Sequence, residues 1–197
     1  MENLKSLAEE LASIPWSDRL LQDEGLVLTV PESRRQQRSV RVDIRTDAAF
    51  RQLLNTEDAI PLYLVLYRPP SPQEQPSGPQ KGPVTEVLGI IRLGAGVSGF
   101  PNVCHGGIVG TLLDEIMGEL ITVNLKHRTI PSLSFMTAYL NITYLRPVRA
   151  PSAVLARARL VRLEARRKLR AVATIEDGNK TVLAKAEALF VGVSTRL

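Results

Sequence analysis

A histidine followed by two glycines stands directly before a long apolar stretch of the chain. These residues are His105, Gly106 and Gly107, and Asp114 follows nine positions after the histidine. The spacing of the apolar residues predicts a helix that begins at the glycines. Unpaired amides at a helix N-terminus present positive partial charge to an approaching oxygen, and glycine has no side chain to block a ligand. The segment therefore has the chemistry of an oxyanion hole.

Asp114 falls on the face of this helix that carries small residues. The other members of the face are spaced by three, four and seven positions, and they are Gly107, Gly110, Thr111 and Gly118. A glycine inside a helix costs about 1 kcal/mol relative to alanine, so we expect another backbone or a ligand to approach closely here. A carboxylate in such a seam is either a working base or a group that bonds a neighbouring strand, and the residues alone leave both interpretations open.

The elements that position these residues indicate an α+β architecture. Periodicity predicts one long helix, two strands before it and an antiparallel meander of four strands after it, in which Asp177-Gly178-Asn179 is a typical hairpin turn. The expected strands are 61–67, 87–97, 133–144, 153–163, 169–176 and 181–193, and the expected helices are 3–13, 48–54 and 106–124.

Composition divides the chain into three parts. Residues 1–67 are an N-terminal extension with a first strand region. Residues 68–83 contain six prolines among sixteen residues and predict a surface insertion of extended chain. Residues 84–197 carry the pattern of the main domain.

The bulk properties are those of a soluble globular protein. The chain has 197 residues, 44% hydrophobic and 23% charged. A net charge of +5 favours anionic partners. A single cysteine excludes an internal disulfide, no apolar run is long enough to span a membrane, and the first residues do not resemble a signal peptide. We expect a cytoplasmic protein, with peroxisomal and mitochondrial locations as alternatives. Residues 194–197 loosely resemble a peroxisomal targeting signal.

Several other patterns are explained by packing or surface roles rather than by catalysis or ligand binding. Gly94 to Gly99 spells a dinucleotide fingerprint, but the helix begins too late for it. Cys104 lies beside His105 without a third orienting residue, which favours a packing role, and His127 is expected on the surface. Two histidines and one cysteine predict no metal site, and nothing indicates a cofactor.

Two groups of basic residues are interpreted mainly as solvated surface. The first lies in the irregular region 27–43. The second is the hairpin of residues 157–170, which either presents a solvated strand face or holds the phosphates of a nucleotide-bearing ligand. No aromatic residues are interleaved with these charges to stack bases, so nucleic acid is not an expected partner.

Two motifs carry a family resemblance. The segment from His105 to Asp114, with its His-Gly-Gly start, and the strand from Thr137 to Pro147 resemble hot-dog thioesterases of the phenylacetate-pathway and human acyl-CoA thioesterase-like superfamily. The resemblance covers residues 86–193, and Ile14-Pro15-Trp16 together with the proline-rich insertion is similar to fungal members. It implies a hot-dog fold, in which a curved antiparallel sheet wraps a helix, and a homodimer or tetramer with active sites between subunits.

The resemblance also implies roles for particular residues. The Gly107 amide would polarise a thioester carbonyl, and Asp114 of the neighbouring subunit would activate water or attack directly. Thr137 would hold the water or the carboxylate, and His105 would position the thioester. The residues expected to contact substrate are Gly106, Asn102, Thr111 and Arg146. Some relatives carry an asparagine or glutamine six residues before the histidine, where this chain has Gly99, so the nucleophile stays open.

The function that these residues predict is hydrolysis of an acyl thioester carried by coenzyme A or by a carrier protein. Amide donors stabilise a developing oxyanion by about 3 to 4 kcal/mol in comparable sites. The alternative is a hot-dog module that binds an acyl chain or acts as a scaffold in a biosynthetic pathway without hydrolysing anything.

Overall fold

A computed structural model describes residues 11, 14–35, 47–70, 72–73 and 80–194. Three of the expectations lie largely or wholly outside these residues: the helix at 3–13, the body of the proline-rich insertion and the C-terminal residues 195–197. Within the insertion, only β3 (Pro72–Gln73) and β4 (Gln80–Lys81) are described, and they pair antiparallel.

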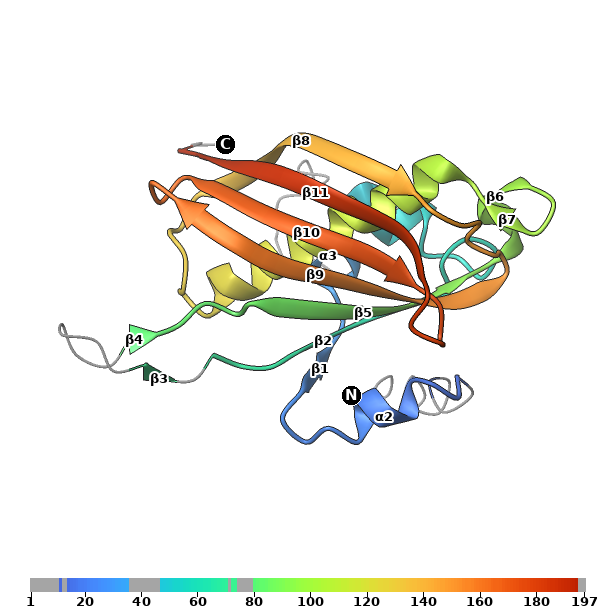
Figure 1. Ribbon diagram of the computed structural model, residues 1–197, viewed down its shortest axis with the longest axis horizontal. Helices are drawn as coiled ribbons and strands as arrows, with labels where there is room; N and C mark the ends of the chain where they lie inside the picture. Colours follow the sequence, from blue (N-terminus) through green and yellow to red (C-terminus); the bar gives the residue numbers. More distant parts are fainter. Residues whose placement is uncertain (1–10, 12–13, 36–46, 71, 74–79, 195–197) are drawn as a thin grey trace.

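A seven-stranded antiparallel sheet forms the centre of the protein (Figure 1). Its strands in spatial order are β1 (Val27–Thr29), β2 (Leu62–Tyr67), β5 (Glu86–Leu93), β9 (Ser152–Glu164), β10 (Lys168–Glu176), β11 (Val182–Val193) and β8 (Ser134–Tyr144). The strand β2 pairs with β5 over its whole length, so the N-terminal region extends the same sheet as the main domain. The α+β architecture is confirmed.

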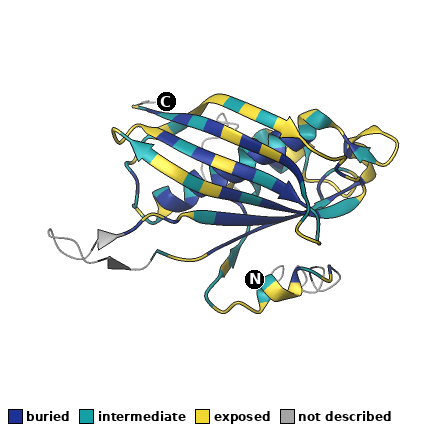
Figure 2. Cartoon of the chain, in the orientation of Figure 1, coloured by how far each residue is buried: buried dark blue, intermediate teal, exposed yellow. Residues whose placement is uncertain are grey.

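The long helix α3 (Gly106–Lys126) packs across the inner face of the sheet. Its apolar residues meet the inward side chains of the strands, which alternate with outward polar ones, as the bands along β10 and β11 in Figure 2 show. Leu112, Leu113 and Ile116 are fully buried there. In the described part of the chain, no helix is both long and apolar enough to cross a membrane.

The N-terminal segment covers part of the outer face of the sheet. Leu11 and Ile14 join a second apolar cluster with residues of β2, β5 and β9. The short helix α2 (Asp18–Leu21) follows, and the Trp16 indole lies directly against the backbone of Gly178 at the β10–β11 turn. The segment then returns through β1 to the 3-10 turn η1 (Glu32–Arg34), whose residues contact α3.

Most of the elements expected from the sequence are confirmed within two residues. The strand expected over 87–97 ends at Leu93, and the turn η3 (Ala95–Val97) and a small hairpin of β6 (Ser98–Phe100) and β7 (Val103–Cys104) follow it. The helix expected over 48–54 is a single π-helical turn, η2 (Ala49–Leu53).

Two side chains that were expected on the surface pack against aromatic rings instead. Arg34 lies over the ring of Tyr63, and its Nη2 donates to the carbonyl of Ile60 at 2.6 Å. His127 packs edge-on against Tyr67, with 3.2 Å between its Nε2 and the tyrosine hydroxyl. In both cases the partner comes from β2 or its flank, which sequence periodicity does not connect to these positions.

Candidate active site

The N-terminus of α3 is shaped by His105. The histidine backbone is extended, with φ −60° and ψ 133°, and it is the N-cap residue of the helix. Its imidazole Nδ1 accepts a hydrogen bond from the amide of Gly107 at 3.0 Å. The amide therefore points outward to an acceptor rather than into the helix, as expected for a first-turn N–H that has no intrahelical partner.

Two hydroxyl groups hold the carbonyls of the glycine pair. Tyr144, from the end of β8, donates to the carbonyl of Gly106 at 2.9 Å, and Thr111 donates to the carbonyl of Gly107 at 2.9 Å. The Tyr144 bond fixes the first turn of the helix relative to β8, because Tyr144 belongs to the strand, whereas the Thr111 bond stays within α3. The sequence analysis placed Tyr144 in a motif but gave it no role.

Asp114 lies two turns further along α3 and is tied to the same strand. Its Oδ1 accepts a hydrogen bond from the Thr137 hydroxyl at 2.9 Å. The register between β11 and β8 shifts between Leu189 and Phe190, which is where Thr137 meets its partner. Such a bulge redirects a side chain, here toward the helix. The carboxylate is half-buried and the threonine is exposed.

Two glycines on the small-residue face of α3, Gly110 and Gly118, have different surroundings. A Cβ on Gly110 would meet the side chain of Ile142 at 3.0 Å, so this glycine allows β8 to approach the helix. A Cβ on Gly118 would meet nothing within 4 Å among the described residues. The close approach expected from the sequence is thus present at one glycine, and open space is present at the other.

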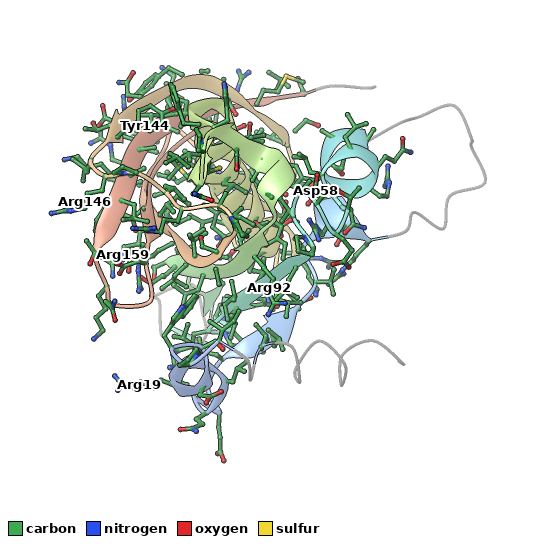
Figure 3. All side chains as sticks on the ribbon, turned by 90° about the vertical axis from the view of Figure 1, so that its right-hand side faces the viewer. Arg19, Asp58, Arg92, Tyr144, Arg146 and Arg159 are labelled. Atoms are coloured by element: carbon green, nitrogen blue, oxygen red, sulfur yellow. The ribbon has the colours of Figure 1, made fainter. Side chains whose placement is uncertain are left out.

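The structure brings six of the eight expected site residues together at this end of α3. They are His105, Gly106, Gly107, Thr111, Asp114 and Thr137. Asn102 lies on the turn of the β6–β7 hairpin with φ 60°, and Arg146 lies beyond the end of β8, where it extends outward from the ribbon (Figure 3). Arg146 donates to the carbonyl of Val182 at 3.1 Å. Neither residue hydrogen-bonds the other six within the described chain.

Two further carboxyl groups of α3 lie close to Asp114. Glu115 and Glu119 are on the adjoining face, and burial raises the pKa of Glu115 to about 7 and that of Glu119 to about 8. Nearby negative charges, including Asp114 beside Glu115, add to the effect. Two glutamates four residues apart in an otherwise apolar helix were a visible signal that the sequence analysis passed over.

Cys104 is unsuited to act as a nucleophile. The side chain is buried, and burial raises the pKa of its thiol to about 11, so the reactive thiolate is scarce at neutral pH. The thiol contacts the carbonyl of His105 rather than the imidazole. Among the described residues, no three His, Cys, Asp or Glu side chains come together in a way that would hold a metal ion.

Four arginines of the basic hairpin of β9 and β10 pair with neighbouring glutamates. Arg157 pairs with Glu86 and Glu176, and Arg159 also pairs with Glu86. Glu164 accepts from two further arginines, Arg162 and Arg170. Paired charges on an exposed sheet face agree better with a solvated surface than with a phosphate site.

The fold and the site define a class of protein. A long helix lies against the inner face of an antiparallel sheet, and a glycine pair at its start faces the same strand as a carboxylate two turns later. Residues 101–184 match the family model described as thioesterase superfamily, so this part of the chain is similar to that superfamily, and the observed fold is consistent with the hot dog. The resemblance and the fold class inferred from the sequence are both confirmed.

Named relatives match the chain over about half its length or somewhat more. Verlamelin biosynthesis protein B of Lecanicillium sp is 33% identical over 60% of this chain and 60% of its own length. Acyl-coenzyme A thioesterase THEM4 of Mus musculus is 34% identical over 53% of this chain and 42% of its own length. The matching region thus spans 60% or less of these relatives. A Streptococcus mutans protein solved with bound acetyl CoA shares the fold, with a TM-score of 0.50, 21% identity and coverage of 59% of this chain and 87% of that one.

Proposed function

We propose that this protein hydrolyses acyl thioesters of coenzyme A or of a carrier protein. The observation that carries the proposal is the pairing of two features on one helix. The Gly107 amide at the helix start is directed at an acceptor, and the Asp114 carboxylate two turns later is held by Thr137. The match of residues 101–184 to the thioesterase superfamily model and the similarity to the mouse acyl-coenzyme A thioesterase support it.

The reaction needs a base and an oxyanion donor, and the site offers both. A water oxygen attacks the thioester carbonyl carbon while Asp114 takes its proton. The carbonyl oxygen becomes an oxyanion, the carbon–sulfur bond then breaks, and the thiolate leaves and is protonated. Direct attack by the carboxylate, with an anhydride that water later cleaves, is the alternative. General-base catalysis contributes about two to four powers of ten in rate.

The oxyanion donor would be the Gly107 amide. In this structure the imidazole Nδ1 of His105 is the acceptor at 3.0 Å, so it occupies the position that a substrate oxygen would take. We infer that the imidazole turns aside when substrate binds and that the carbonyl oxygen replaces it. The histidine is exposed to solvent. An amide donor of this kind is worth about 3 to 4 kcal/mol in the transition state.

A second copy of the chain would complete the site. The strand β8 is an edge of the sheet, and all eleven of its residues are at least partly accessible. Its backbone offers an unpaired row of donors and acceptors, which is a template for pairing with another chain. Exposed Met136, Tyr144 and Leu145 lie on or directly after it. We propose that two β8 strands pair in a homodimer, so that Asp114 of one subunit faces the Gly107 amide of the other.

The test is release of thiol from a panel of acyl-CoA thioesters and one acylated carrier protein. We expect wild-type protein to release thiol above background and Asp114→Asn to lose at least a hundredfold in kcat, because the amide cannot accept the water proton. Asp18→Asn, on exposed α2, makes the same chemical change away from the site and should leave the rate unchanged. Binding without release by the wild type would favour the non-hydrolytic module, and undiminished turnover by Asp114→Asn would remove Asp114 from the mechanism.

A further inference from the structure

A cavity of about 340 Å³ lies along α3 beside the proposed site. Its walls come from the helix, from the start of β8 and from the N-terminal turn η1. The apolar walls include Leu125, Phe135 and Phe190, and the polar ones include Ser33, Glu115 and Glu119. The space left open at Gly118 is part of this cavity.

The cavity is on the same side of the helix as the catalytic groups. Gly118 follows Asp114 by four residues and therefore lies one turn further on the same face. Phe135 precedes Thr137 by two residues and points to the same side of β8. Because a helix rises about 1.5 Å per residue, the cavity begins about 6 Å beyond Asp114 along the helix axis. An acyl chain that runs away from the reacting carbonyl along α3 would enter it.

Two carboxyl groups line this path, and they are poorly compensated. The Oε1 of Glu119 accepts a hydrogen bond from the amide of Glu32 at 2.9 Å, and the backbone amides of Glu32 and Ser33 both lower the pKa of this carboxyl. The positive charge of Arg34 lowers the pKa of Glu115, while the negative charges of Asp47 and Asp114 raise it. Burial raises the pKa of both glutamates, so the site disfavours their charged forms when nothing is bound.

A second observation points to a missing polar partner. Ser33 is 5% exposed and lines the cavity, yet its Oγ makes no hydrogen bond of acceptable geometry. The hydroxyl lies close enough to Glu115 to lower the pKa of that carboxyl. A buried hydroxyl without a partner is unusual and costs free energy. A donor group placed between Ser33 and Glu115 would satisfy both oxygens.

We propose that this cavity receives the acyl chain of the substrate and selects chains that carry a hydrogen-bond donor, a hydroxyl or an ammonium group, at the level of Glu115 and Glu119. The inference rests on the proposed thioesterase function. The phenyl rings and leucine accommodate methylene groups, while Ser33 and the two carboxyls hold the donor. A plain alkyl chain of equal length would fill the cavity but leave the Ser33 hydroxyl without a partner, which is how a polar pocket discriminates against an analogue that lacks the group.

The experiment compares three acyl-CoA series of equal chain lengths: unsubstituted, hydroxylated and amino-substituted at successive carbons. We expect at least one substituted position to exceed the unsubstituted chain by about tenfold or more in kcat/KM, with the maximum at a position a fixed number of carbons from the thioester. Glu115→Gln should abolish a preference for the amine, because it removes the negative charge, and should only weaken a preference for the hydroxyl. Glu187→Gln, on the exposed β11 face, is the matched control and should change neither.

Binding of thioether analogues, which cannot be hydrolysed, separates failure of this inference from failure of the proposed function. Tighter binding of a substituted analogue, lost in Ser33→Ala and in Glu115→Gln, would support the selectivity even if no thioester were cleaved. The inference would be overturned if the unsubstituted analogue bound as tightly as every substituted analogue, or more tightly, and if the two variants left the ratios of these affinities unchanged. Hydrolysis of plain chains under those conditions would leave the thioesterase assignment intact.

Discussion

Replacing Glu119 by glutamine should stabilise the protein at neutral and alkaline pH but have little effect in acid. Glu119 is 5% exposed, and burial raises its pKa from an ordinary 4.5 to about 8. The folded protein therefore keeps a proton on Glu119 at pH values where the unfolded chain has lost it. The stabilisation that this proton confers is fully present below about pH 4.5 and is lost as the pH rises toward 8.

The size of the effect follows from the shift. Each pH unit between the two pKa values costs the wild type about 1.4 kcal/mol, so the 2.5 units from pH 4.5 to 7 cost about 3 kcal/mol. Glutamine is neutral at every pH, and its Oε1 retains the acceptor that the Glu32 amide uses. For a chain of this size, about 3 kcal/mol corresponds to roughly 6 to 12 °C in Tm.

The assay is thermal unfolding of the wild type and Glu119→Gln in matched buffers from pH 5 to 8. The difference in Tm should be small at pH 5 and should grow steadily up to about pH 8. Glu187→Gln, which is exposed, should track the wild type throughout. A constant difference between the two proteins across this range, or a variant that is less stable at pH 8, would refute the reasoning that Glu119 is held protonated by burial.

Three further predictions concern contacts of the helix α3 and of the N-terminal segment. Thr137→Val should lower kcat about tenfold with little change in KM, because a hydrogen bond to a carboxylate is worth about 1.5 kcal/mol or more, while Thr137→Ser should retain the rate. His105→Ala removes the acceptor of the Gly107 amide and should cost about 1 kcal/mol in urea unfolding; a variant as stable as the wild type would show that the cap contributes nothing. Trp16→Ala should cost about 2 kcal/mol by the same assay, since the indole packs against Gly178, and equal stability would mean that the N-terminal segment is not anchored there.

The main domain could be predicted from the sequence because its patterns are local. The apolar period of α3 gives the helix, the alternation in β10 and β11 gives the strands, and Asp177-Gly178-Asn179 marks the turn between them. The glycine pair and Asp114 were predicted for the same reason, since helix spacing alone puts them on one face.

The remaining features depend on contacts between distant segments. Arg34 appeared to belong to a solvated basic stretch, but its burial against Tyr63 is a contact across 29 positions that no short pattern encodes. The link between Thr137 and Asp114 was anticipated only through the family resemblance, because it depends on a bulge in β8 that the sequence does not reveal. The Ser33 contribution to the cavity wall likewise requires η1 to fold back onto α3.

The domain boundaries at residues 67 and 84 stay a prediction. They were drawn on composition, because the proline-rich insertion separates two regions of ordinary hydropathy. In the structure, β2 before the insertion pairs with β5 after it. A change in composition along the chain therefore carries little information about which strands become neighbours in the sheet.

The central claim is that a glycine amide of one subunit and Asp114 of its partner act on the same carbonyl, and mixing two inactive variants tests it most directly. Gly107→Pro deletes the amide donor at the second position of α3, where proline is tolerated, and Asp114→Asn deletes the base. If the two chains share each site, unfolding and refolding them together at equal amounts gives half mixed dimers with one intact site each, and thus about a quarter of wild-type activity. A mixture as inactive as its components would contradict the shared site.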